Sequence, residues 1–220
     1  MIPRLRLPLP VLMLLAAAFY HAAMAWGPAA PWLVALSAAA LCAMVTAKTA
    51  RRAFYAGIGA AFLIYIPQLW FFFGIFKVVA IPLWLCLAVW VGMFCGTLHV
   101  FYRKWGVWPA LAVTPVLWMG LEFLRSEVWL LRFSWLTPGY ALPPERMGWL
   151  FQSLGVYGSG ALLVLAGAAL ALVKKPVPAV AACLLLPALL LPGNRQPAAG
   201  GFIPAVILRP EIPADHRHPV

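Results

Sequence analysis

The chain consists of long apolar runs separated by short polar connections. A helix needs roughly 20 apolar residues to cross a bilayer, and each run comes close to that length. Open sheets cannot face lipid, and no run alternates apolar and polar residues as the strands of a membrane barrel do. The pattern predicts an all-α fold, a polytopic transmembrane helix bundle of about seven spans, at residues 7–26, 29–47, 53–73, 78–101, 107–124, 148–173 and 177–192.

The Lys and Arg residues between the runs predict the orientation, because short cytoplasmic connections of membrane proteins are rich in basic residues. With a cytoplasmic N-terminus, the first two outer connections contain only Lys77. The cytoplasmic segments then contain Arg4, Arg6, Lys48, Arg51, Arg52, Arg103, Lys104, Lys174 and Lys175. The opposite orientation would export all of these residues. We therefore predict a multi-pass protein with a cytoplasmic N-terminus and a periplasmic C-terminus.

The first run also has features of a signal peptide. Arg4 and Arg6 precede an apolar core, and residues 23–25 (AMA) resemble a cleavage site. The apolar stretch is long, however, and further spans follow it directly, which favours an uncleaved first helix. Cleavage would leave the topology of the later spans unchanged.

The composition agrees with a membrane protein and excludes an ordinary soluble domain. Hydrophobic residues make up 65% of the chain and charged residues 10%, with a mean hydropathy of +0.95, whereas soluble domains are about a quarter charged. The net charge of +11 would suggest nucleic acid for a soluble protein. Here the basic residues form short clusters between apolar runs, and no basic and aromatic platform is present, so we predict no nucleic-acid partner.

The cysteines and histidines show no metal-binding pattern. All four cysteines, Cys42, Cys86, Cys95 and Cys183, lie inside apolar runs without ligand spacing. We interpret them as small buried hydrophobic residues, and we predict neither a metal nor a cofactor.

The run at 107–124 contains a carboxylate, Glu122, followed three residues later by Arg125. Residues at i and i+3 can interact on one helix face, and Trp118 lies one turn earlier on the same face. A charge inside a span is costly and commonly marks a functional site. Two interpretations remain open: an ion pair that anchors the helix end, or a polar notch that receives a lipid head group, since Arg can bind phosphate.

The segment 125–147 is rich in aromatic residues, including Trp135 and Tyr140. One interpretation is interfacial anchoring by aromatic side chains. The other is a short loop that dips into the membrane beside the charged pair, with the Tyr140 hydroxyl available to a substrate.

The C-terminal part of the chain differs from the rest. Residues 193–201 (GNRQPAAGG) are typical of a linker, and residues 202–208 (FIPAVIL) favour a short strand. One strand cannot form a domain. We therefore divide the chain into a helix bundle at 1–192, followed by a linker and the opening strand of a further domain at 193–220.

Several of these segments together resemble the apolipoprotein N-acyltransferase family. The most specific are residues 115–125 (PVLWMGLEFLR), 133–136 (FSWL) and 139–140 (GY). The third span with its ending at residues 70–74 and the segment 152–158 (QSLGVYG) also look like that family. Residues 205–213 (AVILRPEIP) resemble the first strand and turn of its nitrilase-like domain.

The resemblance implies an enzyme of bacterial lipoprotein maturation in the inner membrane. The family transfers an acyl chain from a phospholipid to the N-terminal amine of a diacylglyceryl-modified cysteine on an apolipoprotein, through a thioester on a cysteine assisted by a Glu and a Lys. Those three residues belong to the nitrilase-like domain, so no catalytic residue transfers to this chain. The positions that transfer, as lipid-binding or docking residues, are Trp118, Glu122, Arg125, Trp135 and Tyr140.

The expected partners are membrane phospholipid, the apolipoprotein and a separate nitrilase-like subunit. We expect a split subunit, a truncated product or a degenerate relative that is inactive without the catalytic domain. Two other functions remain open: a non-enzymatic scaffold for a periplasmic partner, and a small lipid transporter. A transporter would need polar groups along a path across the whole bilayer, and Glu122 is the only acid in any predicted span.

Overall fold

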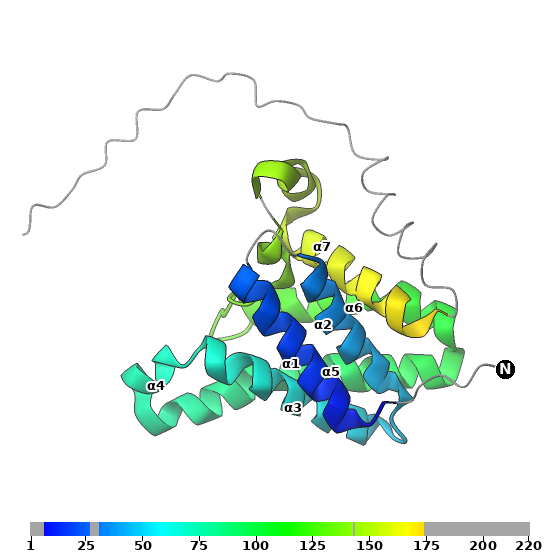
Figure 1. Ribbon diagram of the computed structural model, residues 1–220, viewed down its shortest axis with the longest axis horizontal. Coiled ribbons are helices and arrows are strands. Elements are labelled where there is room, and N and C mark those ends of the chain that lie inside the picture. The colour runs from blue at the N-terminus through cyan, green and yellow to red at the C-terminus, as the bar shows by residue number, and fades with distance from the viewer. Residues whose placement is uncertain (1–6, 27–30, 143, 174–220) are drawn as a thin grey trace, which may run out of the picture.

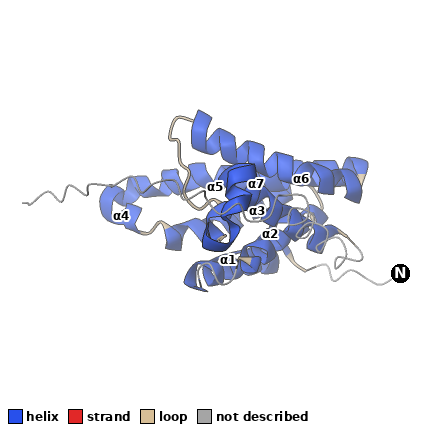
Figure 2. Cartoon of the chain, turned by 90° about the horizontal axis from the view of Figure 1, so that it is seen from above, coloured by secondary structure: helices blue, strands red, loops and turns tan. Residues whose placement is uncertain are grey.

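The computed structural model describes residues 7–26, 31–142 and 144–173, and within these ranges it contains helices and turns but no strand (Figure 2). Four helical stretches are long and apolar enough to cross a membrane: Leu9–Trp26, Phe71–Trp105, Val107–Val128 and Gly148–Leu172. Trp32–Thr46 is a shorter apolar helix. The predicted all-helical class is confirmed for the described residues. The predicted span 177–192 and the segment 193–220 lie outside them.

Helices α1 (Leu9–Trp26) and α2 (Trp32–Ala43) lie side by side in Figure 1. Small residues lie at this contact, such as Ala16, which is fully buried and allows the two backbones to approach closely. The Ser37 hydroxyl donates a hydrogen bond of 2.7 Å to the carbonyl of Ala16. A short 3-10 turn, η2 (Met44–Thr46), then leads to the next helix.

Helix α3 (Ala50–Gln68) packs against α5 (Ala80–Trp105) through glycines. A Cβ atom at Gly57 would lie 2.9 Å from both the Cys95 Sγ and the Val91 carbonyl, so only glycine fits there without a shift. Between the two helices, α4 (Phe71–Phe76) and the 3-10 turn η3 (Lys77–Val79) protrude at the left of Figure 1.

The run 53–73, predicted as one span, is divided in the structure. Helix α3 ends at Gln68, and residues 71–73 belong to α4. Pro67 has no N–H and leaves the Leu63 carbonyl, four residues earlier, without its helical donor. The His21 Nε2 of α1 donates to this carbonyl at 2.9 Å, and the Gln68 amide donates to His21 Nδ1 at 3.0 Å. Tertiary contacts therefore replace the helical bond where α3 ends.

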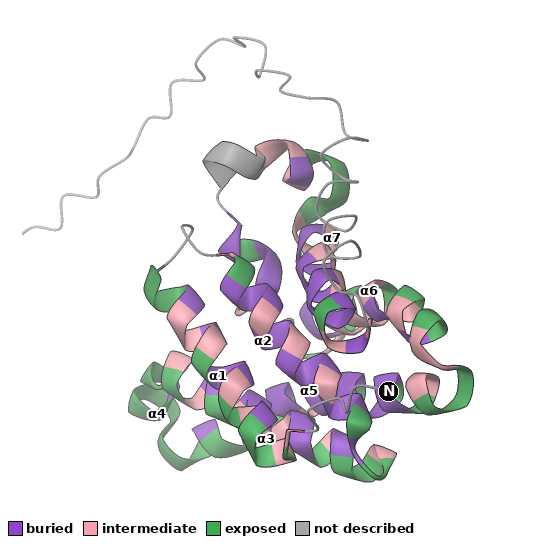
Figure 3. Ribbon diagram, turned by 45° about the vertical axis from the view of Figure 1, so that its right-hand side comes forward, coloured by how far each residue is buried: buried purple, intermediate pink, exposed green. Residues whose placement is uncertain are grey.

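Helix α6 (Val107–Phe123) continues into a π-helical turn (Leu124–Val128), and after the 3-10 turn η5 (Pro138–Ala141) the chain enters α7 (Pro144–Leu172). The predicted loop 125–147 thus begins and ends in helical structure. Figure 3 shows buried residues concentrated on the inner sides of α2, α5 and α7, and exposed residues over α4. Gly167 of α7 contacts α2, where its missing side chain leaves room for the Ala35 carbonyl.

Candidate functional site

One face of α6 points into the bundle and carries the predicted site. Ala110, Thr114, Trp118 and Glu122 follow one another at intervals of four residues, which places them on one side of the helix. The first, second and fourth of these residues are buried, and Trp118 is half-buried. Glu122 and Arg125 are each only 4% exposed. The structure encloses the pair inside the bundle.

Glu122 and Arg125 form the one ion pair found among the described residues. The Arg125 Nη2 lies 3.8 Å from the Glu122 Oε1. No hydrogen bond of good geometry reaches the carboxylate oxygens within the described structure, although the Trp118 and Thr137 side chains lie close enough to interact with them. The Arg125 Nε is also buried there without a partner. A buried charge is stable only when it is paired. The Arg125 guanidinium therefore stabilises the Glu122 carboxylate inside the bundle.

Arg125 also connects three parts of the fold. Its Nη1 donates to the Tyr65 hydroxyl of α3 at 3.3 Å, and its Nη2 donates to the Trp135 carbonyl at 3.4 Å. The five N–H groups of Arg in a rigid fork suit such contacts in several directions. Arg125 therefore fastens the chain after α6 to the bundle, in addition to pairing with Glu122.

Further hydrogen bonds hold the segment 129–137. The Ser126 hydroxyl donates to the Phe133 carbonyl at 3.3 Å, and the Phe133 N–H donates to the Arg125 carbonyl at 3.3 Å. From α1, the Tyr20 hydroxyl donates to the Leu136 carbonyl at 3.2 Å. Arg132 and Leu136 have φ angles of 43° and 62°, which are costly for non-glycine residues and persist only where the surroundings impose them.

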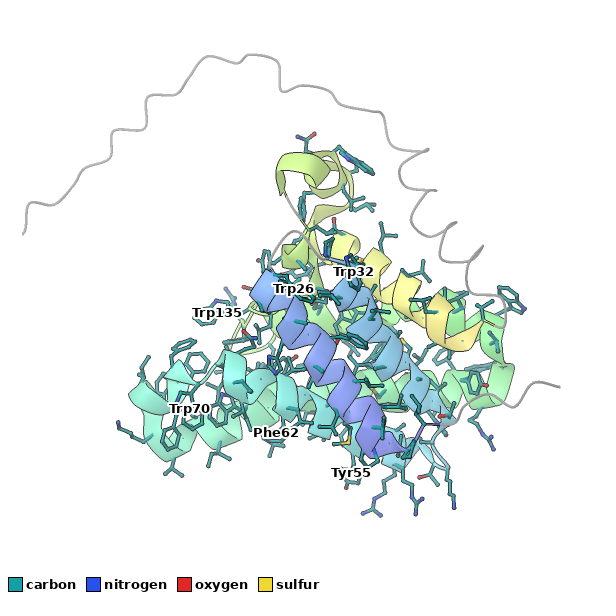
Figure 4. All side chains as sticks on the ribbon, in the orientation of Figure 1. Trp26, Trp32, Tyr55, Phe62, Trp70 and Trp135 are labelled. Carbon is teal, nitrogen blue, oxygen red and sulfur yellow. The ribbon has the colours of Figure 1, made fainter. Side chains whose placement is uncertain are left out.

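The segment 129–137 presents aromatic rings at the bundle surface. The Trp135 ring lies 5.6 Å from Phe71, 5.8 Å from Phe72 and 5.3 Å from Phe133, measured between ring centroids. We call these four residues the aromatic corner. Trp135 is 49% exposed, and it lies on the same side of the molecule as Trp70 (Figure 4). The corner joins α4 to the loop that Arg125 fastens.

The structure brings together most of the predicted site residues. Trp118, Glu122 and Arg125 share one buried place, and Trp135 reaches it through its backbone carbonyl while its ring faces outward. Tyr140 is 60% exposed and lies near Tyr157 of α7 instead. Sequence reasoning missed Tyr20 and Tyr65. A tyrosine inside an apolar run, whose hydroxyl needs a partner when buried, could have drawn attention to them.

A small cavity lies beside the ion pair, lined by Tyr65, Trp90, Phe94 and Trp118 together with the charged residues. Its volume is about 20 Å³, which is enough for one water molecule. A lipid head group does not fit into it in this conformation. Within the described residues, Arg125 of the pair instead contacts Tyr65 and the Trp135 carbonyl.

The described residues contain no assembled nucleophilic centre. Cys42 and Cys95 are buried, and Cys86 is exposed on the outer side of α5. No three His, Cys, Asp or Glu side chains come together within the described ranges. The arrangement can position a loop and present an aromatic surface.

The family model described as the apolipoprotein N-acyltransferase N-terminal domain matches residues 11–169 of this chain. The match covers α1 to α7 and includes every predicted site residue. No curated protein matches the chain.

Proposed function

Because the chain belongs to the family of the apolipoprotein N-acyltransferase N-terminal domain, we propose that it serves as the membrane part of such an acyltransferase. The reaction would transfer an acyl chain from a phospholipid to the N-terminal amine of a diacylglyceryl-cysteine on an apolipoprotein. The bundle would sit in the bacterial inner membrane and offer both lipid substrates a docking surface. The observation that carries this proposal is the aromatic corner, whose position Arg125 fixes from inside the bundle.

The role of each site residue follows from its surroundings. Trp135 contacts the acyl chains of a substrate with its exposed ring, because aromatic side chains are suited to the boundary between lipid tails and head groups. Arg125 is a positioning residue that acts through the Trp135 carbonyl, and Glu122 stabilises the guanidinium. Trp118 packs against Phe94, with 4.9 Å between the ring centroids, and supports α6 from the inside. Tyr140 offers an exposed hydroxyl to the apolipoprotein.

Catalysis itself belongs to a nitrilase-like partner in this proposal. The buried thiols of Cys42 and Cys95 have no Lys or carboxylate beside them in the described structure, and a reactive thiol needs an electropositive, accessible setting. We therefore expect that the purified 220-residue chain, incubated with phospholipid and a diacylated lipopeptide, forms no N-acylated lipopeptide.

A chimera provides the direct experiment. Residues 1–192 replace the membrane domain of an active apolipoprotein N-acyltransferase, and N-acylation of a diacylated lipopeptide is measured by mass spectrometry. We expect product from the chimera, and a loss of about tenfold in rate on Trp135→Ala, equivalent to about 1.4 kcal/mol. Trp108→Ala, which removes an exposed Trp from the far end of α6, serves as the matched control with unchanged rate. A folded chimera without product would contradict the proposal.

We also propose seven crossings with a cytoplasmic N-terminus, the last crossing at 177–192. The start of α3 lies beside the C-terminal half of α5, as the approach between Ala50 and Gly96 requires, so the basic residues at 48–52 and 103–104 gather at one end of the bundle. Cytoplasmic placement of that end agrees with the enrichment of basic residues there. In intact cells, a membrane-impermeant maleimide should label Arg132→Cys and leave Arg51→Cys unlabelled. The reverse pattern would overturn this orientation.

A further inference from the structure

A groove lies on the outer face of the bundle, between α3 and α5. Its walls include Phe54 of α3 and, from α5, the exposed side chains of Met93, Thr97 and Val100. It is a shallow groove, open along the surface, with a volume of about 400 Å³. We call it the α3–α5 groove.

The groove has a physical cause in the packing of the two helices. Gly96 forms part of its lining, and a Cβ atom there would lie 3.3 Å from the Phe54 Cβ and 3.6 Å from the Ala50 carbonyl. The backbones therefore come close at the floor, while Met93, Thr97 and Val100, at i, i+4 and i+7, form a ridge along one side. Seven residues of helix give the ridge a length of about 10 Å, enough for part of an acyl chain.

One end of the groove is basic. Arg51 lines it directly, and its guanidinium lies 5.5 Å from the Tyr55 ring. Lys48 and Arg52 are exposed close by in the chain, and α3 has no acidic residue in its first turn. In the described part of the molecule, none of these three cations has a carboxylate partner. Figure 4 shows Tyr55 at the lower edge of the molecule with several nitrogen-tipped side chains beside it.

The groove thus combines an open apolar surface with a positive charge at one end, and no carboxylate among the described residues pairs with that charge. Thr97 adds an exposed hydroxyl that has no hydrogen-bond partner in the part of the chain that the structure describes. A second helix would bury the Arg51 charge without compensation, and that is unfavourable in a lipid environment. A neutral lipid would fill the channel and leave the cations unpaired. An anionic phospholipid suits both parts of the groove. Its acyl chain covers the apolar part, and its phosphate binds Arg51, because Arg binds phosphate oxygens through charge-assisted hydrogen bonds.

We propose that the α3–α5 groove binds one anionic phospholipid, with its phosphate at Arg51, its glycerol ester at Thr97 and an acyl chain against Phe54 and Met93. On the orientation proposed above, this lipid belongs to the cytoplasmic leaflet. The groove lies on the outer side of the α3–α5 contact, whereas Glu122 lies where α6 packs on α5. Lipid binding here requires no acyl transfer, so the two proposals stand or fall separately.

The test is native mass spectrometry of the purified full-length chain in detergent, titrated with phosphatidylglycerol or with phosphatidylcholine that carries the same acyl chains. We expect one phosphatidylglycerol to bind with about tenfold higher affinity than phosphatidylcholine. Arg51→Gln should weaken phosphatidylglycerol binding about tenfold, or about 1.4 kcal/mol. Arg103→Gln removes the same charge at the same end of the bundle without touching the groove, and it should change binding by less than about twofold.

A third variant tests the apolar part of the groove. Thr97 is exposed, so Thr97→Trp fills the channel without disturbing the core, and it should lower the affinity for both lipids. If Arg51→Gln and Arg103→Gln lowered the affinity for phosphatidylglycerol equally, the lipid would be attracted by the overall charge of the basic end. That result would overturn the proposal. Unchanged binding in Thr97→Trp would overturn it as well, and so would equal affinities of the wild-type chain for the two lipids.

Discussion

Replacement of Arg125 by Gln tests how much the buried charged pair contributes to the stability of the bundle and to the position of the loop. The variant loses the hydrogen bonds to the Tyr65 hydroxyl and to the Trp135 carbonyl, at 3.3 and 3.4 Å. Both bonds are long, and hydrogen bonds inside membrane proteins contribute on average about 0.6 kcal/mol each. The larger loss comes from Glu122, whose carboxylate remains buried without a cation. Removing one partner of a buried pair costs about 3–5 kcal/mol in all, the lost hydrogen bonds included, so we expect a total of at least about 3 kcal/mol.

The stability of the detergent-solubilised chain can be followed with a thiol-reactive dye in a background that carries Cys86→Ser and Cys183→Ser, because Cys42 and Cys95 are buried and become reactive only on unfolding. A loss of about 3 kcal/mol corresponds to a decrease of about 8 °C in the unfolding midpoint. Glu122→Gln in the Arg125→Gln background removes the orphaned carboxylate and should recover part of that decrease. An unchanged midpoint in Arg125→Gln would refute the assignment of the pair as a structural element.

Proteolysis reports on the loop separately from global stability. Arg132 is exposed within the segment that Arg125 fastens, and it provides a trypsin site whose cleavage depends on local opening. If Arg125→Gln destabilises the closed loop by about 2 kcal/mol, cleavage after Arg132 becomes about 30-fold faster, since each 1.4 kcal/mol is tenfold. Arg103→Gln serves as the control, because this exposed residue lies next to the start of α6, whereas the loop follows the other end of that helix. Equal cleavage rates in wild-type and Arg125→Gln chains would show that the loop is held by other contacts.

Three further changes probe other contacts of the bundle. Tyr65→Phe leaves a buried guanidinium N–H without its acceptor and should destabilise the chain by about 1–2 kcal/mol, measured with the same dye; no effect would show that the 3.3 Å bond is too weak to matter. Gly167→Ala places a Cβ atom against the α2 backbone and should cost about 1–3 kcal/mol, whereas Gly120→Ala, where nothing lies within 4 Å, should not destabilise the chain. In detergent, N-ethylmaleimide should modify the exposed Cys86 long before the buried Cys42, and peptide mapping that found the opposite order would contradict the packing of α5.

The helical runs could be predicted from the sequence because lipid demands apolar side chains and complete backbone hydrogen bonding. The division of the third run could not be predicted, although Pro67 was visible. Pro115 has the same chemistry, yet α6 continues through it. What distinguishes Pro67 is that His21, from another helix, bonds the freed Leu63 carbonyl. This hydrogen-bond partner is 42 residues away in the chain, so the sequence around Pro67 does not indicate it.

The candidate site was also predictable only in part, namely in the contacts within one helix. The proximity of Trp118, Glu122 and Arg125 follows from their spacing on one helix. Their burial and the two acceptors of the guanidinium do not, because Tyr65 belongs to another helix and the Trp135 carbonyl to an irregular segment. The aromatic side chains drew attention to the loop, but a backbone carbonyl carries no residue-specific feature that a sequence could reveal.

The arginines of this chain differ in function because they differ in burial. Arg51 is exposed, and its unpaired charge can attract an external anion. Arg125 is enclosed, pairs with Glu122 and donates to two oxygens of the protein. Its Nε–H has no partner among the described residues, but it is buried with the rest of the guanidinium. A lipid phosphate could reach Arg125 only after the loop had moved away and the Glu122 contact had broken. The geometry therefore agrees with loop positioning by Arg125, and it agrees with our proposal that a lipid head group binds at the exposed basic end of α3.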